Sequence, residues 1–212
     1  MNKAFFPEKE SIVREEGEKM IFINQNDYDD MPYPTNLKMP NSVLATKGTM
    51  SIAGCGICCV SMMIEALTFD HLPLEKGIEY AMASKANWEP GTDMRLLGAY
   101  TAKKHALDYK VTDNIEEALE HLREGGHVIA NVSGDKEGYI GVYSDVGHYL
   151  LLLSVKDHML TVLDSSLKPE KFEKEGRKGK VTIKGNYTLC HKDIMVAETL
   201  HKSPRYHLFN RK

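Results

Sequence analysis

The sequence predicts an α+β fold with a helical N-terminal half and an antiparallel sheet in the C-terminal half. From residue 55 to residue 126 apolar residues recur with helical spacing, and after residue 126 short apolar runs alternate with turn residues. Helices that come first and strands that come later favour α+β over alternating β–α–β architecture. The 212 residues contain no internal repeat and no linker-like stretch, so we expect one domain over residues 1–212.

The N-terminal segment precedes the main helices. Within residues 1–20 a charged stretch, Glu8–Met20, predicts an N-terminal extension helix. The apolar run "MIFIN" that follows predicts a short strand. The next stretch, "YDDMPYPTNLKMPNS", contains three prolines and is too long for a tight turn, so we expect a long loop.

Four helices are expected between residues 55 and 126. The first begins near Cys55, and the second has Pro73 in its first turn, where the missing N–H of proline is tolerated. The third begins in "GTDMRLLGAY", with Thr92 as the expected N-cap. The fourth is "NIEEALEHLR", with Asp113 as the expected cap and Gly125 as the stop.

Strand-like runs dominate the rest of the chain. They are rich in Val, Ile, Leu and aromatic residues and are separated by Gly, Asp or Lys turns, which predicts an antiparallel sheet. The runs are "HVIANVS", "HYLLLLSV", "MLTVLDS", "KVTIKG" and "RYHLFNR".

Composition narrows the function classes. The formal net charge is −3 and the basic residues are dispersed, so we expect no nucleic-acid partner. No stretch approaches the roughly 18 apolar residues of a membrane span, so we expect none. The first residues lack the apolar core of a secretory signal. We therefore expect a cytoplasmic protein if the chain is complete, or a secreted or cell-surface one if a signal segment has been removed. Nothing in the sequence indicates an oligomeric state.

Three of the four cysteines lie within five positions, in "GCGICCVSMMIEAL". A helix that is apolar nearly all round is a buried helix, and cysteine is one of the residue types most often buried. We therefore expect Cys58 and Cys59 to pack in the core. Cys55 differs because it opens the helix between Gly54 and Gly56. There the free N–H groups and the positive helix end stabilise a thiolate, which is the nucleophilic form of cysteine.

Two other readings of the cysteines remain open. Cys55 and Cys58 form a CxxC pair, which in a thioredoxin-like context would be a redox site. That context requires a strong preceding strand, whereas "NSVLATKGTMSIAG" is polar and interrupted by glycine. A zinc site could recruit Cys55 and Cys58 together with Cys190 and His191, although structural zinc ligands usually come as paired knuckles.

A thiol nucleophile requires a base, and the base requires an orienting group. Among the nine histidines, His148 stands at the start of the most apolar strand, and Asp164 ends the next one. A three-residue turn between these strands would pair Val155 with Met159. Asp164 would then be a diagonal neighbour of His148 on one face, within reach of a hydrogen bond. A two-residue turn would put the two side chains on opposite faces.

The order of these segments resembles the papain-fold cysteine peptidases of family thirty-nine type, relatives of the leader-peptide peptidase domains of bacterial bacteriocin exporters. The likeness extends over about Phe22–Ser166 and is carried by "INQNDYD", "GCG", "LREGGHVIANVSGD", "GHYLLLLSV" and "LTVLDSS". The family usually has proline and a small hydroxyl residue after "GCG", where this chain has Ile57 and Cys58. It usually has proline after the orienting aspartate, where this chain has Ser165.

The resemblance implies a papain-like fold and a set of site residues. It implies Cys55 as nucleophile, His148 as general base and acid, and Asp164 as the group that orients the imidazole. Gln25 resembles the family glutamine whose side-chain amide joins the Cys55 N–H in an oxyanion hole.

The expected function is that of a cysteine hydrolase that cleaves a peptide or a related amide through a thioester intermediate. No metal or organic cofactor is implied, and the expected partner is the peptide or amide substrate. The alternative from another class is a catalytically silent papain-fold module that binds a peptide. A thiol–disulfide protein that uses the CxxC pair is the third possibility.

Overall fold

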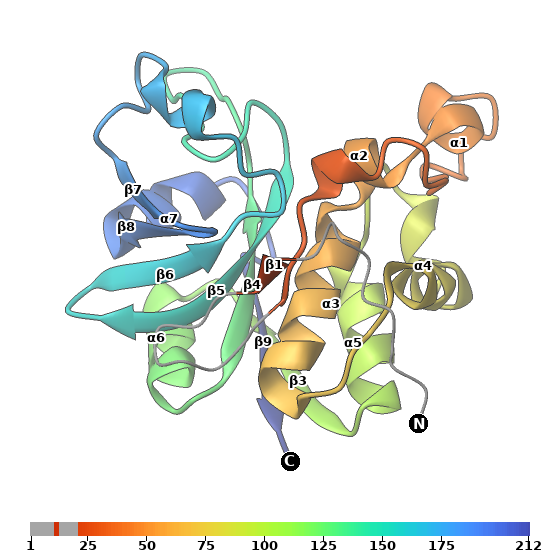
Figure 1. Cartoon of the computed structure of the whole chain (residues 1–212), viewed down its shortest axis with the longest axis horizontal. Helices are drawn as coiled ribbons and strands as arrows, with labels where there is room; N and C mark the ends of the chain where they lie inside the picture. Colours follow the sequence, from red (N-terminus) through yellow and green to blue (C-terminus); the bar gives the residue numbers. More distant parts are fainter. Residues whose placement is uncertain (1–10, 13–20) are drawn as a thin grey trace.

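The apolar strands of the C-terminal half pair into one antiparallel sheet. The computed structural model describes residues 11–12 and 21–212, and in this part of the chain the sheet has seven strands in the order β3-β9-β4-β5-β6-β8-β7 (Figure 1). The strands are β3 (Leu107–Thr112), β4 (His127–Val132), β5 (His148–Lys156), β6 (Met159–Leu163), β7 (Val181–Lys184), β8 (Tyr187–His191) and β9 (Tyr206–Arg211).

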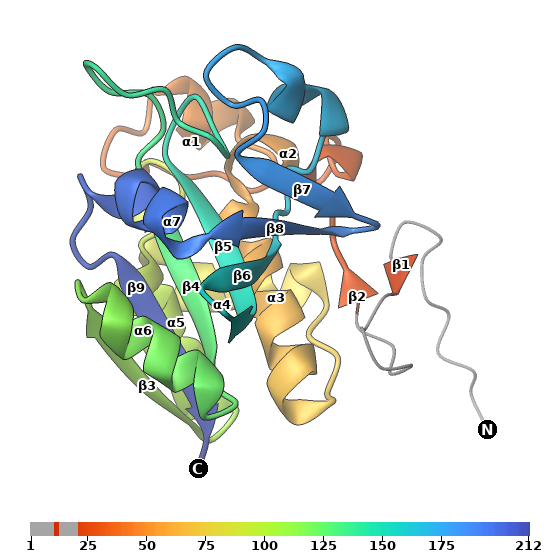
Figure 2. The same ribbon diagram turned by 90° about the vertical axis from the view of Figure 1, so that its left-hand side faces the viewer.

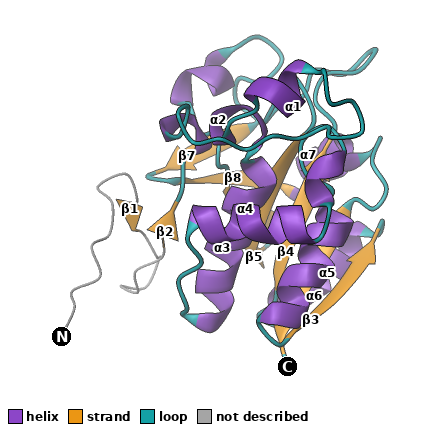
Figure 3. Ribbon diagram, turned by 90° about the vertical axis from the view of Figure 1, so that its right-hand side faces the viewer, coloured by secondary structure: helices purple, strands orange, loops and turns teal. Residues whose placement is uncertain are grey.

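Helices cover both faces of this sheet. On one face lie α3 (Cys55–Thr68), α4 (Leu74–Ala83) and α5 (Met94–Lys104), which are in front of the strands in Figure 3. On the other face lie α6 (Ile115–Arg123) and α7 (Lys192–Thr199), which are in front in Figure 2. The short helices α1 (Val43–Lys47) and α2 (Met50–Ala53) lead into α3.

Successive side chains of β4 pack into two different apolar cores, one on each face of the sheet. Val128, Ala130 and Val132 pack with α6 and α7, whereas Ile129 points to the core that contains α3. Successive side chains of a strand point to opposite faces, so a strand buried on both sides is apolar throughout. The α+β prediction, with a buried helix packed on a C-terminal antiparallel sheet, is confirmed.

Short 3-10 helices occur in three connections: before α1, between α4 and α5, and after β6. These are η1 (Gln25–Asp27), η2 (Ala86–Trp88) and η3 (Pro169–Glu173). The predicted strand in "MIFIN" is present as β2 (Ile21–Phe22), which pairs with β1 (Ser11–Ile12). Of the predicted extension helix, the structure describes only the two residues of β1, which are extended, and the rest of that expectation lies outside the described residues. Among the described residues no helix is long and apolar enough to cross a membrane.

Two predicted helix caps are wrong by one residue. Asp93, not Thr92, caps α5, because its carboxylate accepts a hydrogen bond from the N–H of Arg95. Asn114, not Asp113, caps α6 in the same way. In both cases the side chain bonds the N–H two residues further on. Asp113 instead accepts a hydrogen bond from the backbone N–H of Arg205, which follows the last helix.

The turn between β5 and β6 also differs from the prediction. Lys156 pairs with Met159, so the turn has two residues rather than three. Asp157 and His158 both have positive φ angles, 49° and 68°, as type I′ hairpin turns require. Taken alone, this turn would have moved His148 and its expected partner to opposite faces of the sheet.

A β-bulge at Leu153 reverses that shift. The register changes between Leu152 and Ser154, and below the bulge Leu151 pairs with Leu163, as the three-residue turn would have required. A bulge adds one unpaired residue to one strand and so changes the facing of every residue beyond it. The predicted turn is wrong, but the pairing of β5 with β6 next to His148 is the one that was predicted.

Five further helices and strands were not predicted from the sequence, namely α1, α2, β3, β8 and α7. The segment "LDYKVT" forms β3 after a helix that ends at Lys104, and β8 and α7 follow the β7 strand. None of these elements contributes the residues on which the site prediction depends.

Candidate active site

Helix α3 carries Cys55 at its first position. The helix is apolar nearly all round, and its residues from Gly56 to Ile64 are buried, as expected for a central helix. Cys58 and Cys59 are fully buried, which confirms their packing role, whereas Cys55 is partly exposed. The first N–H groups of a helix have no intrahelical acceptor, so donors surround the Cys55 position.

The glycines on either side of Cys55 are required by packing. A Cβ on Gly54 would lie 2.5 Å from the carbonyl oxygen of Met50. A Cβ on Gly56 would lie 3.0 Å from Cβ of Thr92 and 3.2 Å from Cε of Met94. The start of α3 is therefore held tightly against α2 and against the segment that precedes α5.

The surroundings of the Cys55 sulfur favour the thiolate. Burial acts to raise the pKa of Cys55, but a hydrogen bond from His148 and the charge of that imidazole outweigh it. The backbone N–H groups of Tyr149 and Gly56 also donate to the sulfur. As a result the pKa of Cys55 is lowered from its ordinary value of 9.0.

His148 occupies the first position of β5 and is 6% exposed. Its Nε2 lies 2.9 Å from Oδ1 of Asp164, so Nδ1 is the ring nitrogen that remains for Cys55. Burial acts to lower the pKa of His148, but the hydrogen bonds to Asp164 and Cys55 raise it to about 9. These contacts favour the protonated imidazole, opposite a thiol with a lowered pKa.

Asp164 follows the last residue of β6 and is completely buried. Its Oδ1 accepts hydrogen bonds from Nε2 of His148 and from the N–H of Ser166, both at 2.9 Å. Its Oδ2 accepts a hydrogen bond from the ammonium of Lys171. Burial acts to raise the pKa of Asp164, but His148 and Lys171 together lower it to about 2.

Gln25 lies in η1, next to α2. Its Nε2 donates to the carbonyl oxygen of Ser51 at 2.8 Å, and its Oε1 accepts from the hydroxyl of Ser165 at 3.0 Å. A carbonyl oxygen can only accept, so the nitrogen must face Ser51 and the orientation of the amide is fixed. The NH₂ group has a second N–H, whose direction is set by the same two bonds.

The structure thus brings the predicted Cys55, His148 and Asp164 together in one chain of contacts. Sequence reasoning missed Tyr149 and Lys171. The apolar periodicity of β5 gives no sign that the N–H of Tyr149 donates to sulfur. Lys171 follows Asp164 by seven positions in a charged segment, where it is not distinguishable from its exposed neighbours.

The zinc alternative requires residues that the fold separates. Cys58 belongs to the core around α3, whereas Cys190 belongs to the core on the opposite face of the sheet. Within residues 11–12 and 21–212 no group of three or more His, Cys, Asp or Glu side chains is arranged to hold a metal ion. For the redox alternative, Cys58 is fully buried, and burial raises its pKa well above 9.0, which disfavours its thiolate.

A buried helix that begins at a partly exposed thiol, packed on an antiparallel sheet that carries the histidine and the aspartate, defines a papain-like α+β fold. Solved structures share it, among them two proteins that are named as peptidases. The peptidase domain of Streptococcus ComA, a bi-functional ABC transporter involved in quorum sensing, is 12% identical with a TM-score of 0.50, and the match covers 76% of this chain and 93% of that one. A Bacillus anthracis protein classed as a C39-like peptidase is 10% identical with a TM-score of 0.52, and the match covers 97% and 99%.

No family model matches the chain, and no curated protein matches it in sequence. The structural likeness is therefore one of fold: the chain has the fold of the C39 papain-like cysteine peptidases.

Proposed function

We propose that this protein is a cysteine hydrolase that cleaves a peptide or a related amide bond, with Cys55 as nucleophile. The observation that carries the proposal is the pairing of Cys55, whose pKa is lowered, with His148, whose pKa is raised to about 9. Opposite shifts in a contacting thiol and imidazole favour a resting thiolate–imidazolium pair, which is the reactive form of such a nucleophile.

The proposed reaction has two halves. The Cys55 thiolate attacks the substrate carbonyl carbon and forms a C–S bond, and the carbonyl electron pair moves to oxygen. When the tetrahedral intermediate collapses, the C–N bond breaks and Nδ1 of His148 gives its proton to the leaving amine. A water molecule, deprotonated by His148, then attacks the thioester, releases the acid and restores the Cys55 thiolate.

Two donors are proposed for the developing oxyanion: the backbone N–H of Cys55 and the second side-chain N–H of Gln25. The bonds from Gln25 to Ser51 and Ser165 support this, because they hold the amide in one orientation before substrate arrives. Donors fixed in advance stabilise charge that develops in the transition state, at roughly 3–4 kcal/mol for each donor that mutagenesis removes.

Asp164 has the proposed role of orienting His148. Its bond to Nε2 fixes the ring, so that Nδ1 stays directed at the sulfur, and its negative charge stabilises the imidazolium. The fold likeness to two proteins that are named as peptidases agrees with hydrolysis of a peptide bond.

The test is site-resolved alkylation of the four cysteines with iodoacetamide between pH 4 and pH 10, read by peptide mass spectrometry. Cys58, Cys59 and Cys190 are fully buried and serve as internal references in the same molecule. We expect Cys55 to be labelled far faster than these three, with a midpoint below pH 9.0. A His148→Gln variant should move that midpoint towards the ordinary thiol value, because the imidazolium is lost.

A second measurement separates an enzyme from a silent peptide-binding module. The wild-type protein and Cys55→Ser are incubated with a mixture of synthetic peptides, and new termini are read by mass spectrometry. Cleavage by the wild type and none by Cys55→Ser supports the hydrolase. Rapid labelling of Cys55 with no cleavage and no thioester adduct would favour the silent module, and uniformly slow labelling would overturn the proposed nucleophile.

A further inference from the structure

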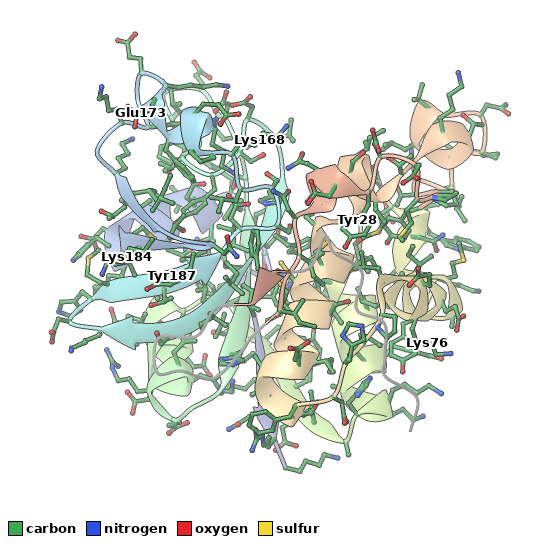
Figure 4. The ribbon with its side chains drawn as sticks, viewed as in Figure 1. Tyr28, Lys76, Lys168, Glu173, Lys184 and Tyr187 are labelled. Atoms are coloured by element: carbon green, nitrogen blue, oxygen red, sulfur yellow. The ribbon has the colours of Figure 1, made fainter. Side chains whose placement is uncertain are left out.

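A lysine lies directly behind the aspartate of the site. Lys171 belongs to η3, in the segment that follows β6, and its ammonium forms an ion pair with Oδ2 of Asp164. The side chain of Lys171 is 11% exposed and that of Asp164 is 0% exposed. Lys168 and Glu173, which flank Lys171 in the chain, lie in this segment above the strands (Figure 4). Lys171 is thus a surface-segment lysine with its ammonium turned inward.

Three oxygen atoms surround the ammonium group of Lys171, one for each of its N–H donors. Besides Asp164, Nζ donates to the carbonyl oxygen of Ser166 at 3.1 Å and lies 3.4 Å from the Ser166 hydroxyl. It also lies 5.1 Å from the ring centre of Phe172, which is buried beside it. An ammonium has three donors, so the geometry holds it in one position.

The same contacts fix the carboxylate. His148 and the N–H of Ser166 both bind Oδ1 of Asp164, and Lys171 binds Oδ2. Rotation of the carboxylate about its last bond would break all three interactions. Oδ1 is therefore kept turned towards the imidazole, and the order of charges from the sulfur outward is negative, positive, negative, positive.

Bulk water does not reach Asp164 to stabilise its charge. Among the described residues, Cys59 of α3 and Tyr143 of the β4–β5 loop are two other titratable groups that interact electrostatically with it. Burial raises the pKa of both well above their ordinary values, so both are neutral at working pH. Without Lys171, the buried Asp164 would have His148 as its one charged partner in the described part of the chain and the N–H of Ser166 as a neutral donor, and a buried carboxylate without sufficient partners takes up a proton.

We propose that Lys171 is a positioning residue for the proposed hydrolysis: its ammonium keeps Asp164 ionised and keeps Oδ1 directed at His148. The inference rests on the proposed function, since it assigns Lys171 a part in the same site. Lys171 acts through Asp164, and substrate does not touch it. Its removal should therefore lower kcat and kcat/KM by the same factor and leave KM unchanged.

The experiment compares four variants with the wild type. Lys171→Met removes the charge, Lys171→Gln removes the charge but keeps a hydrogen-bond donor, and Lys171→Arg keeps the charge. Lys168→Met is the matched control, because Lys168 is exposed in the same segment and forms no ion pair with Asp164 in the described part of the chain. The rate of Cys55 alkylation is measured against pH, and the ¹³C shift of the Asp164 carboxyl, assigned with Asp164→Asn, is titrated in each protein.

We expect the Asp164 carboxyl to titrate at higher pH by roughly 1–3 units in Lys171→Met and Lys171→Gln, the shift that loss of a contacting opposite charge causes. The acid limb of Cys55 alkylation should move to higher pH in the same two variants, because the imidazolium of His148 loses the charge of Asp164. Lys171→Arg and Lys168→Met should follow the wild type.

An unchanged Asp164 titration in Lys171→Met, in protein with a native near-UV circular dichroism spectrum, would overturn the proposal. If Lys171→Met does not fold, the comparison of Lys171→Gln with Lys171→Arg decides the same question. The carboxyl titration needs no activity, so it remains decisive if Cys55 is slow to react in the wild type. Slow labelling of wild-type Cys55 would then count against the hydrolase alone.

Discussion

The hydroxyl of Ser165 donates a hydrogen bond to Oε1 of Gln25, across 3.0 Å and 140 positions of sequence. The backbone makes a second link in the same place, since the N–H of Gln25 donates to the carbonyl oxygen of Ser165 at 2.6 Å. Ser165 follows Asp164 directly, so one short segment holds both the proposed oxyanion donor and the aspartate of the site. At the position of Ser165, the family that the sequence resembles usually has proline, which carries no hydroxyl.

Gln25→Ala should lower kcat/KM by roughly 10²-fold or more, because it removes an oxyanion donor. Ser165→Ala should lower kcat/KM by about 5- to 10-fold, the effect of losing one orienting hydrogen bond worth about 1 kcal/mol. Both are measured with whichever peptide the wild type cleaves. In the double variant, Ser165→Ala should have no further effect, because Ser165 acts through Gln25. Additive losses would show that Ser165 acts elsewhere.

Protonation of Asp164 in acid should lower the free energy of unfolding. The pKa of Asp164 is about 2 in the folded protein and 3.8 ordinarily, so its ionised form stabilises the native state above about pH 4. That contribution, on the order of 2 kcal/mol, disappears as the pH falls from about 4 to about 2. Urea unfolding at several pH values should show it as a decline that Asp164→Asn does not share. Asp108→Asn, at an exposed position, should decline as the wild type does, and an identical slope in Asp164→Asn would contradict the assignment.

Glu198→Gln should destabilise the fold. The carboxylate of Glu198 is fully buried in α7 and accepts hydrogen bonds from the hydroxyl of Tyr139 and from the N–H groups of Val142 and Tyr143. Glutamine offers one acceptor and turns an NH₂ group towards these donors, which leaves buried donors unpaired at about 1–3 kcal/mol each. We expect the free energy of unfolding in urea to fall by about 2–3 kcal/mol.

These Glu198 bonds hold the loop between β4 and β5, which ends at His148. Hydrogen exchange of the loop amides should therefore accelerate in Glu198→Gln, and Cys55 alkylation should become slower as His148 loses its fixed position. Glu175→Gln, at an exposed site, is the control. Native protection of the Val142 amide in Glu198→Gln would exclude the anchoring role.

Gly56→Ala should weaken the contact between α3 and the start of α5. The added methyl would lie 3.0 Å from Cβ of Thr92 and 3.2 Å from Cε of Met94, closer than packed carbons normally approach. Overpacking of this kind costs about 1–3 kcal/mol, measurable by thermal or urea unfolding. Thr92→Ser removes one methyl from the contact, so Gly56→Ala with Thr92→Ser should recover part of the loss. No recovery would mean that the strain lies elsewhere.

The local sequence was sufficient for the central elements. The apolar run after Cys55 can form only a buried helix, and the glycine before it marks the helix start. His148 and Asp164 were predicted as neighbours because each flanks an apolar strand and only one short turn separates the strands. Signals of this kind come from periodicity and turn residues within about ten positions.

The connection between β5 and β6 could not be predicted from such local signals. The two-residue turn and the bulge at Leu153 each shift the register by one, and the predicted contact survives only because both are present. Neither apolar periodicity nor turn composition reveals a bulge inside an apolar strand, because a one-residue insertion changes which neighbours pack and not which residues are apolar.

The sequence by itself determined the layout: helices before strands, a thiol at a helix start, and a histidine and an aspartate on adjacent strands. Only the tertiary structure decided the environment of those groups, namely the Lys171 ammonium behind Asp164, the Ser165 bond to Gln25 and the Tyr149 N–H at the sulfur. Periodicity is a property of neighbouring residues, whereas charge states and side-chain orientations depend on burial and on partners that folding brings from distant parts of the chain.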